Sequence, residues 1–148
     1  MPQVAGGLDV RLAAAFAEAA PAAPALLVGM DTPQLAARTV AEPLAPARRT
    51  GVDAWLGPAA DGGFWALGLA RPTPALARRL LLGLPMSTDR TGAVLAARLA
   101  DAGLAVERLP QLRDVDEVAD AAEAAALAPH GRFAACWRTV GSRVGAAR

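Results

Sequence analysis

The sequence predicts an α/β fold in three layers, with helices on both faces of one sheet. Short apolar runs typical of strands alternate along the chain with segments that repeat apolar residues at helical spacing. Gly and Pro residues fall between these segments, and no repeat or internal boundary is visible. The length of 148 residues suits a single domain. We therefore expect one domain over 1–148, with 128–148 as a C-terminal extension.

The first half of the chain contains signals for two helices and three strands. Pro21 and Pro24 are expected to end the first helix, because proline interrupts helical hydrogen bonding. Thr32 and Pro33 are suited to the N-cap and the first position of the second helix. The predicted elements are a helix over 8–20, a strand over 25–29, a helix over 32–42, and strands over 52–56 and 64–69.

The second half contains signals for four helices and one more strand. Thr73 and Pro74 predict a cap and a first helical position, and either Ser87 or Asp89 could cap the next helix. Gly103 is expected to end that helix. The predicted elements are helices over 74–82 and 89–102, a strand over 104–109, an Ala-rich helix over 117–127, and a short helix over 133–140.

Composition and charge exclude several classes of function. The formal net charge is +1, and all fifteen basic residues are arginines, so nothing favours a nucleic-acid or acidic-membrane partner. The one cysteine, Cys136, permits no intrachain disulfide, and we expect it to be a buried apolar filler in a cytoplasmic protein. We expect no signal peptide in MPQVAGGLDVRL, and no apolar window reaches the roughly 18 residues of a membrane span.

Acidic residues follow the predicted strands, where α/β sheets bind their ligands. Asp31, Asp61 and the pair Asp114 and Asp116 all lie at such positions. A divalent cation such as Mg²⁺ is often held by one or two carboxylates together with phosphate oxygens, and it neutralises charge on a leaving phosphate. The alternative is local: Asp31 could stabilise a helix start by roughly 1 kcal/mol, and the later aspartates could favour a helix dipole.

Two further polar stretches also have two interpretations. Asp61, Gly62 and Gly63 could form a hairpin turn, or the glycines could let the backbone approach a ligand closely. The run from Ser87 to Asp89 is suited to helix capping, and alternatively to a polar contact with substrate.

Other catalytic arrangements find little support. His130 is the single histidine and lies in a Pro-His-Gly turn, so we do not expect a Ser-His-Asp or Cys-His site. Trp55, Trp65 and Trp137 are expected in the core or at an interface. Neither a Walker motif nor a GxGxxG fingerprint is present.

Four stretches, in order, resemble motifs of one bacterial family. The stretch QVAGGLDVRLAAAF is similar to its QxxGdLGxRmxxAf helix start, although Asp9 replaces a glycine. LLVGMDTPQL resembles its strand-end motif vliGsDcPxL, and GPAADGGFWALGL resembles GPaxDGGYyLiGl, with Phe64 in the place of Tyr. PMSTDRTGAVLAARLADAGLAVERLPQLRDVDEVAD resembles WSTdxvxxxTlxxlxxxGlxvxxLpxlxDvDtxxDL, with Met86 where Trp is common. The resemblance covers about residues 3–127.

The family so identified is a GT-A-like one of unknown function. Its members are called glycosyltransferases or radical-SAM/selenodomain-associated transferases. They are similar to nucleotide-diphospho-sugar transferases and to the guanylyltransferase of molybdenum-cofactor synthesis. The resemblance implies a GT-A fold, Mg²⁺ or Mn²⁺ as cofactor, Asp31 and Asp116 as its ligands, and Asp61 and Asp116 as catalytic residues, with Asp114 supporting Asp116. It also implies a set of substrate-binding residues: Gly29, Thr32, Gly62, Gly63, Ser87 and Thr88.

Two departures from the family pattern leave alternatives open. DVDEVAD lacks the usual Thr-Pro after DVD, so the helix start at Glu117 and the role of Asp116 are open. The family's first strand and phosphate loop, resembling KxPxxGxxKTRL, find no match, so we expect a partial GT-A fold with an exposed sheet edge. Truncation, a natural short form, or completion by a partner or a homodimer would each explain this.

The expected function is metal-dependent glycosyl transfer from a nucleotide-diphospho-sugar to an unknown small acceptor. One alternative is a non-catalytic binding or assembly domain that has lost nucleotide binding, so that this chain is inactive. Another is nucleotidyl transfer, in which pyrophosphate is the leaving group.

Overall fold

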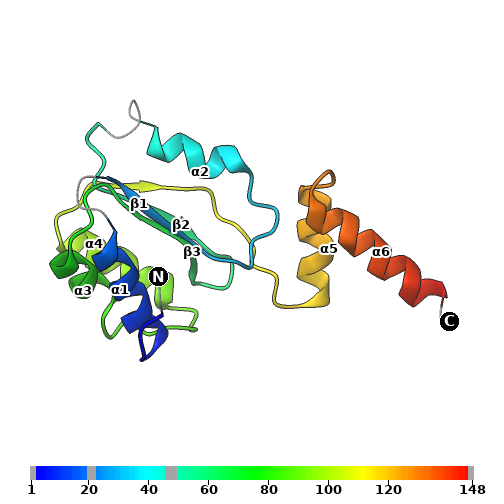
Figure 1. Cartoon of the computed structure of the whole chain (residues 1–148), viewed down its shortest axis with the longest axis horizontal. Coiled ribbons are helices and arrows are strands. Elements are labelled where there is room, and N and C mark those ends of the chain that lie inside the picture. Colours follow the sequence, from blue (N-terminus) through cyan, green and yellow to red (C-terminus); the bar gives the residue numbers. More distant parts are fainter. Residues whose placement is uncertain (1–2, 20–22, 46–49, 147–148) are drawn as a thin grey trace.

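The computed structural model describes residues 3–19, 23–45 and 50–146 (Figure 1). It has an α/β fold, as predicted, with a mixed four-stranded sheet flanked by helices. The elements are, in chain order, α1 (Leu8–Glu18), β1 (Ala25–Val28), α2 (Ala37–Leu44), β2 (Ala54–Pro58), β3 (Phe64–Leu69), α3 (Pro74–Leu81), α4 (Thr91–Asp101), β4 (Val106–Arg108), α5 (Val118–Leu127) and α6 (Arg132–Ala146).

The sheet topology brings three strand ends together. The strand order is β1-β3-β2-β4, in which β3 is antiparallel to both of its neighbours and β2 is parallel to β4. It follows that β1, β2 and β4 all run in one direction, so their carboxyl ends lie at the same end of the sheet. An isolated parallel bridge between Ala59 and Leu112 carries the β2–β4 pairing further toward that end. Among the described strands, β1 and β4 are the two edges.

Helices cover both faces of the sheet, which confirms the three layers. Figure 1 shows α1, α3 and α4 on one face and α2 on the other. Leu67 and Leu69 of β3 pack among Leu80 of α3 and Leu95 and Leu99 of α4, and all five side chains are fully buried. The opposite face is filled by a second cluster of buried residues: Trp55, Trp65, Ala66 and Leu109. The prediction that Trp55 and Trp65 belong to the core is therefore confirmed.

The last two helices form a projection that we call the arm, residues 118–146. Figure 1 shows α5 and α6 extending beyond the end of the sheet, and α6 packs on α5. The segment 109–117 connects the arm to β4. None of the helices in the described ranges is long and apolar enough to cross a membrane.

Several predicted elements are confirmed. The strand over 64–69 has the expected bounds, and the helix predicted over 74–82 starts at Pro74 as expected and ends one residue early, at Leu81. Leu76 N donates to Thr73 Oγ1 at 3.1 Å, as expected of an N-cap. Gly103 follows α4 with a φ of +71°, which suits a helix stop. The strands predicted over 52–56 and 104–109 are displaced or shorter, and α6 is longer than the helix predicted over 133–140. Pro21, expected to end the first helix, lies outside the described residues.

The predicted helix start at Thr32 and Pro33 is wrong. Residues 32–35 form a turn, in which Leu35 N donates to the Thr32 carbonyl at 3.0 Å, and α2 begins only at Ala37. The reason is tertiary: Val115 N donates to the Asp31 carbonyl at 2.9 Å, and the Gln34 side-chain amide donates to the Arg113 carbonyl. These contacts hold the segment outside a helix.

The predicted cap of α4 and the predicted burial of the cysteine are also wrong. Helix α4 begins at Thr91, and its N-cap position is taken by Arg90, whose side chain makes no capping hydrogen bond. The Thr91 hydroxyl donates to the Pro85 carbonyl at 2.6 Å, which ties the first residue of the helix to the preceding loop. Neither Ser87 nor Asp89 caps the helix. Cys136 is exposed, because it lies two residues, or about 200° around the helix, from Ala134, a buried residue of α6.

Candidate functional site

Three carboxylates lie at the end of the sheet where β1, β2 and β4 finish. Asp31, Asp61 and Asp114 line one cavity of about 360 Å³. Each follows its strand or bridge by two or three residues (28 to 31, 58 to 61 and 112 to 114). The parallel directions of these strands explain why residues distant in sequence meet here, as expected of ligand sites in α/β sheets.

The β1–α2 segment, residues 29–35, places Asp31. Gly29 N donates to the Trp65 carbonyl at 2.7 Å, so the chain leaves β1 still attached to β3. A Cβ at Gly29 would lie 2.8 Å from Asp31 Oδ1, which shows that the carboxylate folds back over the glycine. The bond from Val115 N to the Asp31 carbonyl then ties this segment to the neighbour of Asp114. A direct backbone contact thus brings the two aspartates to the same cavity.

The hairpin loop, residues 59–63, places Asp61. Ala59 N donates to the Gly63 carbonyl at 3.1 Å, and Gly63 N donates to Asp61 Oδ1 at 2.7 Å. The carboxylate therefore stabilises its own turn through one oxygen. Its Oδ2 takes no part in that bond and can face a ligand.

Glycine is required at the tip of this loop because another backbone approaches it. Gly62 has a φ of +92°, and a Cβ there would lie only 2.1 Å from the Asp89 carbonyl oxygen. Gly92 N donates to the Gly62 carbonyl at 2.8 Å, and a Cβ at Gly92 would lie 2.4 Å from the Gly63 carbonyl oxygen. The close approach at Gly62 thus comes from the segment that begins α4, which favours the structural interpretation of this glycine.

The loop before α4 forms a polar side of the cavity. Ser87, Thr88 and Thr91 line it, and the two threonine hydroxyls lie 3.2 Å apart, within hydrogen-bond distance of each other. Ser87 has a φ of +57° and is the one non-glycine residue with positive φ in the described ranges. Such a conformation is uncommon for a residue with a side chain and marks a locally constrained loop.

The remaining wall of the cavity is apolar. It is formed by α1, β1, β3 and the 86–88 loop through a set of aliphatic and aromatic side chains: Leu8, Leu12, Leu27, Phe64 and Met86. An apolar wall beside carboxylates lowers the local dielectric constant and strengthens electrostatic interactions in the cavity. None of the arginines in the described ranges is among its lining residues.

Asp114 is the centre of the acidic group. Burial raises the pKa of Asp114 above its ordinary value, and the negative charges of Asp61, Asp116 and Asp31 raise it further, while a backbone hydrogen bond lowers it. The other three carboxylates therefore lie close enough to Asp114 to repel its negative charge. A bound cation would relieve that repulsion, because a nearby positive charge favours the ionised form.

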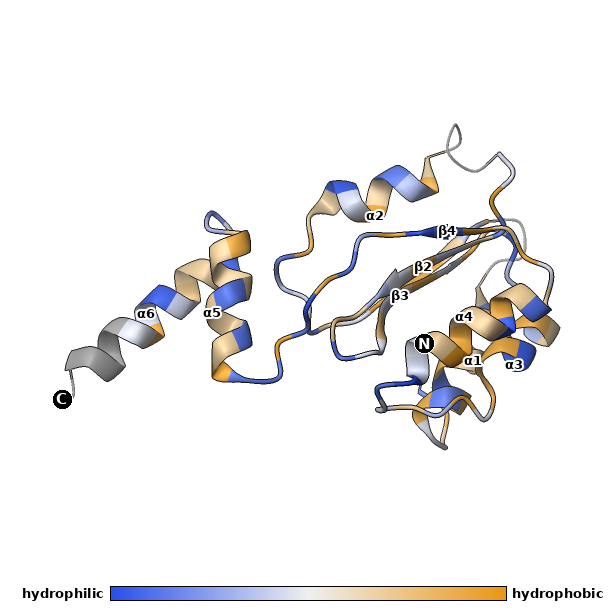
Figure 2. Cartoon of the chain, turned by 180° about the vertical axis from the view of Figure 1, so that it is seen from behind, coloured by the Kyte–Doolittle hydropathy of each residue, from blue (hydrophilic) through white to orange (hydrophobic). Residues whose placement is uncertain are grey.

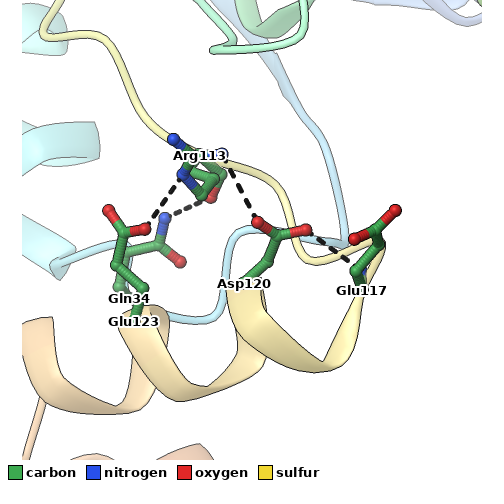
Figure 3. Close-up of polar contacts among 5 residues, drawn as sticks. All are labelled: Gln34, Arg113, Glu117, Asp120 and Glu123. Atoms are coloured by element: carbon green, nitrogen blue, oxygen red, sulfur yellow. Dashed lines mark hydrogen bonds and ion pairs between the residues drawn. The ribbon is translucent and has the colours of Figure 1, made fainter.

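Arg113, the residue before Asp114, attaches this part of the chain to α5 (Figure 3). Arg113 Nη1 lies 3.4 Å from Asp120 Oδ1, and Arg113 Nε lies 3.1 Å from Glu123 Oε2, both on α5. Its carbonyl accepts a hydrogen bond from the Gln34 side chain. Asp120 also accepts from Glu117 N at 3.0 Å, which completes a capping box. Arg113 therefore fixes the chain just before Asp114 between α5 and the β1–α2 segment.

The structure brings together most of the residues expected at the site. Gly29, Asp31, Asp61, Gly63, Ser87 and Thr88 all line the cavity. Thr32, Gly62 and Asp116 are not among its lining residues; Gly62 lines a neighbouring cavity of about 280 Å³.

Asp114, expected only to support Asp116, takes the position in the cavity wall. Asp114 is half-buried, whereas Asp116 is exposed. A signal for this was present in the sequence, because Asp114 follows Leu112 by two residues, much as Asp31 follows the last residue of β1 by three.

The cavity suits a divalent cation that takes part of its coordination from a ligand. Within the described part of the chain, no group of three or more His, Cys, Asp or Glu side chains is placed to hold a metal ion by itself. Mg²⁺ and Mn²⁺ do not require such a group, since one or two carboxylates with phosphate oxygens and water suffice. Oxygen-only side chains at the acidic side match that preference.

Comparison with known proteins agrees with this architecture. Residues 1–88 match the model of a family described as "Uncharacterized protein conserved in bacteria (DUF2064)". The fold resembles the crystal structure of a "putative nucleotide-diphospho-sugar transferase" from Desulfovibrio desulfuricans G20, with a TM-score of 0.62 and 26% identity. The similarity covers 78% of this chain and 49% of that one, so this chain spans about half the length of that protein. No curated protein matches the chain.

Proposed function

We propose that this chain, which belongs to the DUF2064 family, acts as a metal-dependent transferase on a nucleotide-activated donor. Glycosyl transfer from a nucleotide-diphospho-sugar is the reaction we favour. The observation that carries the proposal is the meeting of Asp31, Asp61 and Asp114, from three strand ends, around one cavity. The description of the similar structure supports the same class of donor.

In this proposal Asp31 and Asp114 hold Mg²⁺ or Mn²⁺. The cation would neutralise charge on the diphosphate of the donor, which is the leaving group. Asp116, the ligand implied by the family resemblance, is exposed and outside the cavity wall, so we assign it a lesser role than Asp114. None of the arginines in the described ranges lines the cavity, so the cation would supply the positive charge that neutralises the diphosphate.

Asp61 orients the acceptor. Its Oδ1 accepts from Gly63 N, which fixes the carboxylate and leaves Oδ2 to receive the proton of an acceptor hydroxyl. The acceptor oxygen then forms a bond to the sugar carbon as the bond from that carbon to the phosphate oxygen breaks. Leu12, Phe64 and Met86 exclude water from one side, which disfavours hydrolysis of the donor. Ser87 and Thr88 are suited to polar contacts with the sugar.

Product analysis tests this function. The chain is incubated with Mn²⁺, a panel of nucleotide-diphospho-sugars and simple acceptors, and released nucleotides are separated. We expect nucleoside diphosphate, and a loss of about 100-fold or more in Asp31→Asn and Asp114→Asn. The matched control is Asp101→Asn at the exposed end of α4, which should retain wild-type activity. Release of pyrophosphate would instead assign nucleotidyl transfer.

A non-catalytic binding domain is the second candidate. It is favoured by two observations on the described residues: no arginine lines the cavity, and no cluster of three ligands is ready for a metal. Calorimetry separates the two functions. The transferase requires Mn²⁺ binding that Asp31→Asn and Asp114→Asn abolish and Asp116→Asn weakens less. Absence of heat with Mn²⁺ and with every nucleotide would assign the binding domain.

A further inference from the structure

The arm presents apolar side chains that the chain itself does not cover. Val118 is 77% exposed, Leu127 63% and Val140 52%. Eight of the ten residues of α5 are apolar, and α6 covers only one side of it, where Ala121, Ala124 and Ala125 are buried. Figure 2 shows α5 as apolar along most of its length. A helix that is apolar on nearly all sides is normally buried on more than one of them.

Helix α6 has an apolar stripe that continues past its contact with α5. Phe133, Trp137 and Val140 recur at i, i+4 and i+7, so they lie on one side of the helix. Phe133 and Trp137 are half-buried, whereas Val140 is exposed. Figure 1 shows the distal part of α6 extending away from α5. The stripe thus runs from the contact with α5 into solvent.

The two helices of the arm carry opposite charges. From its N-cap onward α5 has the acidic residues Glu117, Asp120 and Glu123 and no basic one, while α6 has only basic charged residues. The ion pairs that α5 makes within the described chain go to Arg113, outside the arm (Figure 3). Neither Arg132 nor Arg138 forms an ion pair there, although Arg138 donates to the Pro129 carbonyl at 3.1 Å. Among the residues of α6 whose side chains the structure describes, both arginines therefore lack an acidic partner.

A surface that complements α6 exists on the chain itself. The outer side of α5 carries Val118, Ala122 and Ala126 at helical spacing, all exposed, and Glu123 beside them has a side chain that is 54% exposed. Within one arm α6 packs on the other side of α5, where Ala121, Ala124 and Ala125 are buried. The outer side of α5 is thus available to α6 only from a second molecule.

We propose that the arm is a homodimerisation surface, in which α6 of each copy docks on the outer side of α5 of the other. A two-fold axis makes both contacts at once, which gives a four-helix bundle of two arms. Exposed Val118 and Val140 become buried, and the arginines of α6 face the carboxylates of the partner's α5. The arms project from the bodies, so the two sheets remain apart (Figure 1).

Sedimentation and light scattering of the full chain test this inference. We expect the wild-type chain to be a dimer. The double variant Val118→Glu/Val140→Glu should raise the dissociation constant of the dimer at least about tenfold and so convert it to a monomer. The matched control is Leu82→Glu, which places the same charge at a 42%-exposed apolar position outside the arm and should remain dimeric. A wild-type chain that is monomeric at all concentrations overturns the proposal, and so does a folded double variant that stays dimeric.

A second variant keeps the test decisive if that double variant fails to fold, as judged by the near-ultraviolet signal of buried Trp55 and Trp65. Arg132→Glu/Arg138→Glu changes two exposed side chains, and we expect it to weaken the dimer by about tenfold at low salt and less at high salt. Unchanged dimerisation of this variant overturns the proposal. Hydrogen exchange locates the dimer interface, because amides in the interface should become protected as the protein concentration rises. We expect this protection within 118–141, and protection confined to another region, such as the edge of β1, overturns the proposal.

Discussion

The hairpin loop and the β1–α2 segment lie at the same end of the sheet, yet different interactions hold them. The hairpin loop is fixed by backbone contacts, because Gly62 and Gly92 leave no room for a side chain between the loop and the start of α4. The β1–α2 segment is fixed by bonds to residues about eighty positions away, Val115 N to the Asp31 carbonyl and Gln34 to Arg113. It also leaves two buried polar atoms, Thr32 Oγ1 and Gln34 Oε1, without a hydrogen-bond partner among the described residues.

This difference teaches how each aspartate is positioned. Asp61 sits on a sterically rigid loop, so its geometry depends little on what is bound in the cavity. Asp31 and Asp114 sit on two segments that hold each other, so their separation depends on polar contacts that a substitution can loosen. The predictions that follow test this contrast, beginning with the largest expected effect.

Substitution of Gly62 by Ala should severely destabilise the protein. A methyl group would meet the Asp89 carbonyl oxygen at 2.1 Å, and the φ of +92° is unfavourable for alanine, so we expect a loss of roughly 3 kcal/mol or more in the free energy of unfolding. Urea denaturation measures it. The matched control is Gly51→Ala, at a φ of +76° with no atom within 4 Å of the new methyl, which should cost about 1 kcal/mol. Equal losses in the two variants would show that the steric contact contributes nothing.

Substitution of Thr32 by Val should stabilise the protein. Thr32 is 4% exposed and its hydroxyl oxygen has no hydrogen-bond partner among the described residues, so its replacement by a methyl group of similar size removes an unsatisfied buried polar atom. We expect a gain of about 1 kcal/mol in thermal or chemical unfolding. A matched control is Thr91→Val, which removes a hydroxyl bonded to the Pro85 carbonyl and should destabilise. A loss of stability in Thr32→Val would mean that the hydroxyl binds an ordered water or a ligand.

The two loops also differ in how much of them the sequence predicted. The Asp-Gly-Gly stretch left a hairpin turn and a ligand contact as alternatives, and the bond from Gly63 N to Asp61 Oδ1 supports the turn, which is local chemistry. The strand that follows it was predicted correctly from adjacent residues. Thr32 and Pro33 are typical of a helix start, but two long-range bonds override that preference: Gln34 donates to the Arg113 carbonyl, and Val115 N donates to the Asp31 carbonyl. No local pattern in the sequence reveals these bonds. The sequence also could not distinguish Asp114 from Asp116. The positions of the predicted strand ends indicated an acidic site, but the choice between the two aspartates depended on their burial, which only the structure gives.

Substitution of Arg113 by Ala should separate stability from site geometry. The ion pairs to Asp120 and Glu123 are partly exposed, so their loss should cost no more than about 1 kcal/mol in unfolding free energy. If our proposed site is correct, Mn²⁺ affinity should nevertheless fall by about tenfold, because the segment before Asp114 loses its attachment to α5. Calorimetry measures this, with Arg71→Ala as control, since Arg71 pairs with Asp53 outside the cavity wall. An unchanged Mn²⁺ affinity would show that Arg113 does not position the site.

The smallest effect concerns Asp9, which joins α1 to the end of α3. Its Oδ2 accepts from Gly83 N at 2.9 Å, and this hydrogen bond is the main cause that lowers the pKa of Asp9 below 3.8. A lowered pKa means that the folded protein favours the ionised form, so the added stability is present above pH 3.8 and is lost as the pH falls through the lower value. Asp9→Asn should therefore be less stable than wild type near neutral pH, and the difference should shrink below pH 3.8. Urea titrations at several pH values measure it, and a difference that grows toward acid pH would contradict the assignment. Asp9 lies on α1, the helix that supplies Leu8 and Leu12 to the apolar wall of the cavity. The same variant therefore also shows what holds that wall in position: a hydrogen bond between distant residues, as for Asp31, or packing alone.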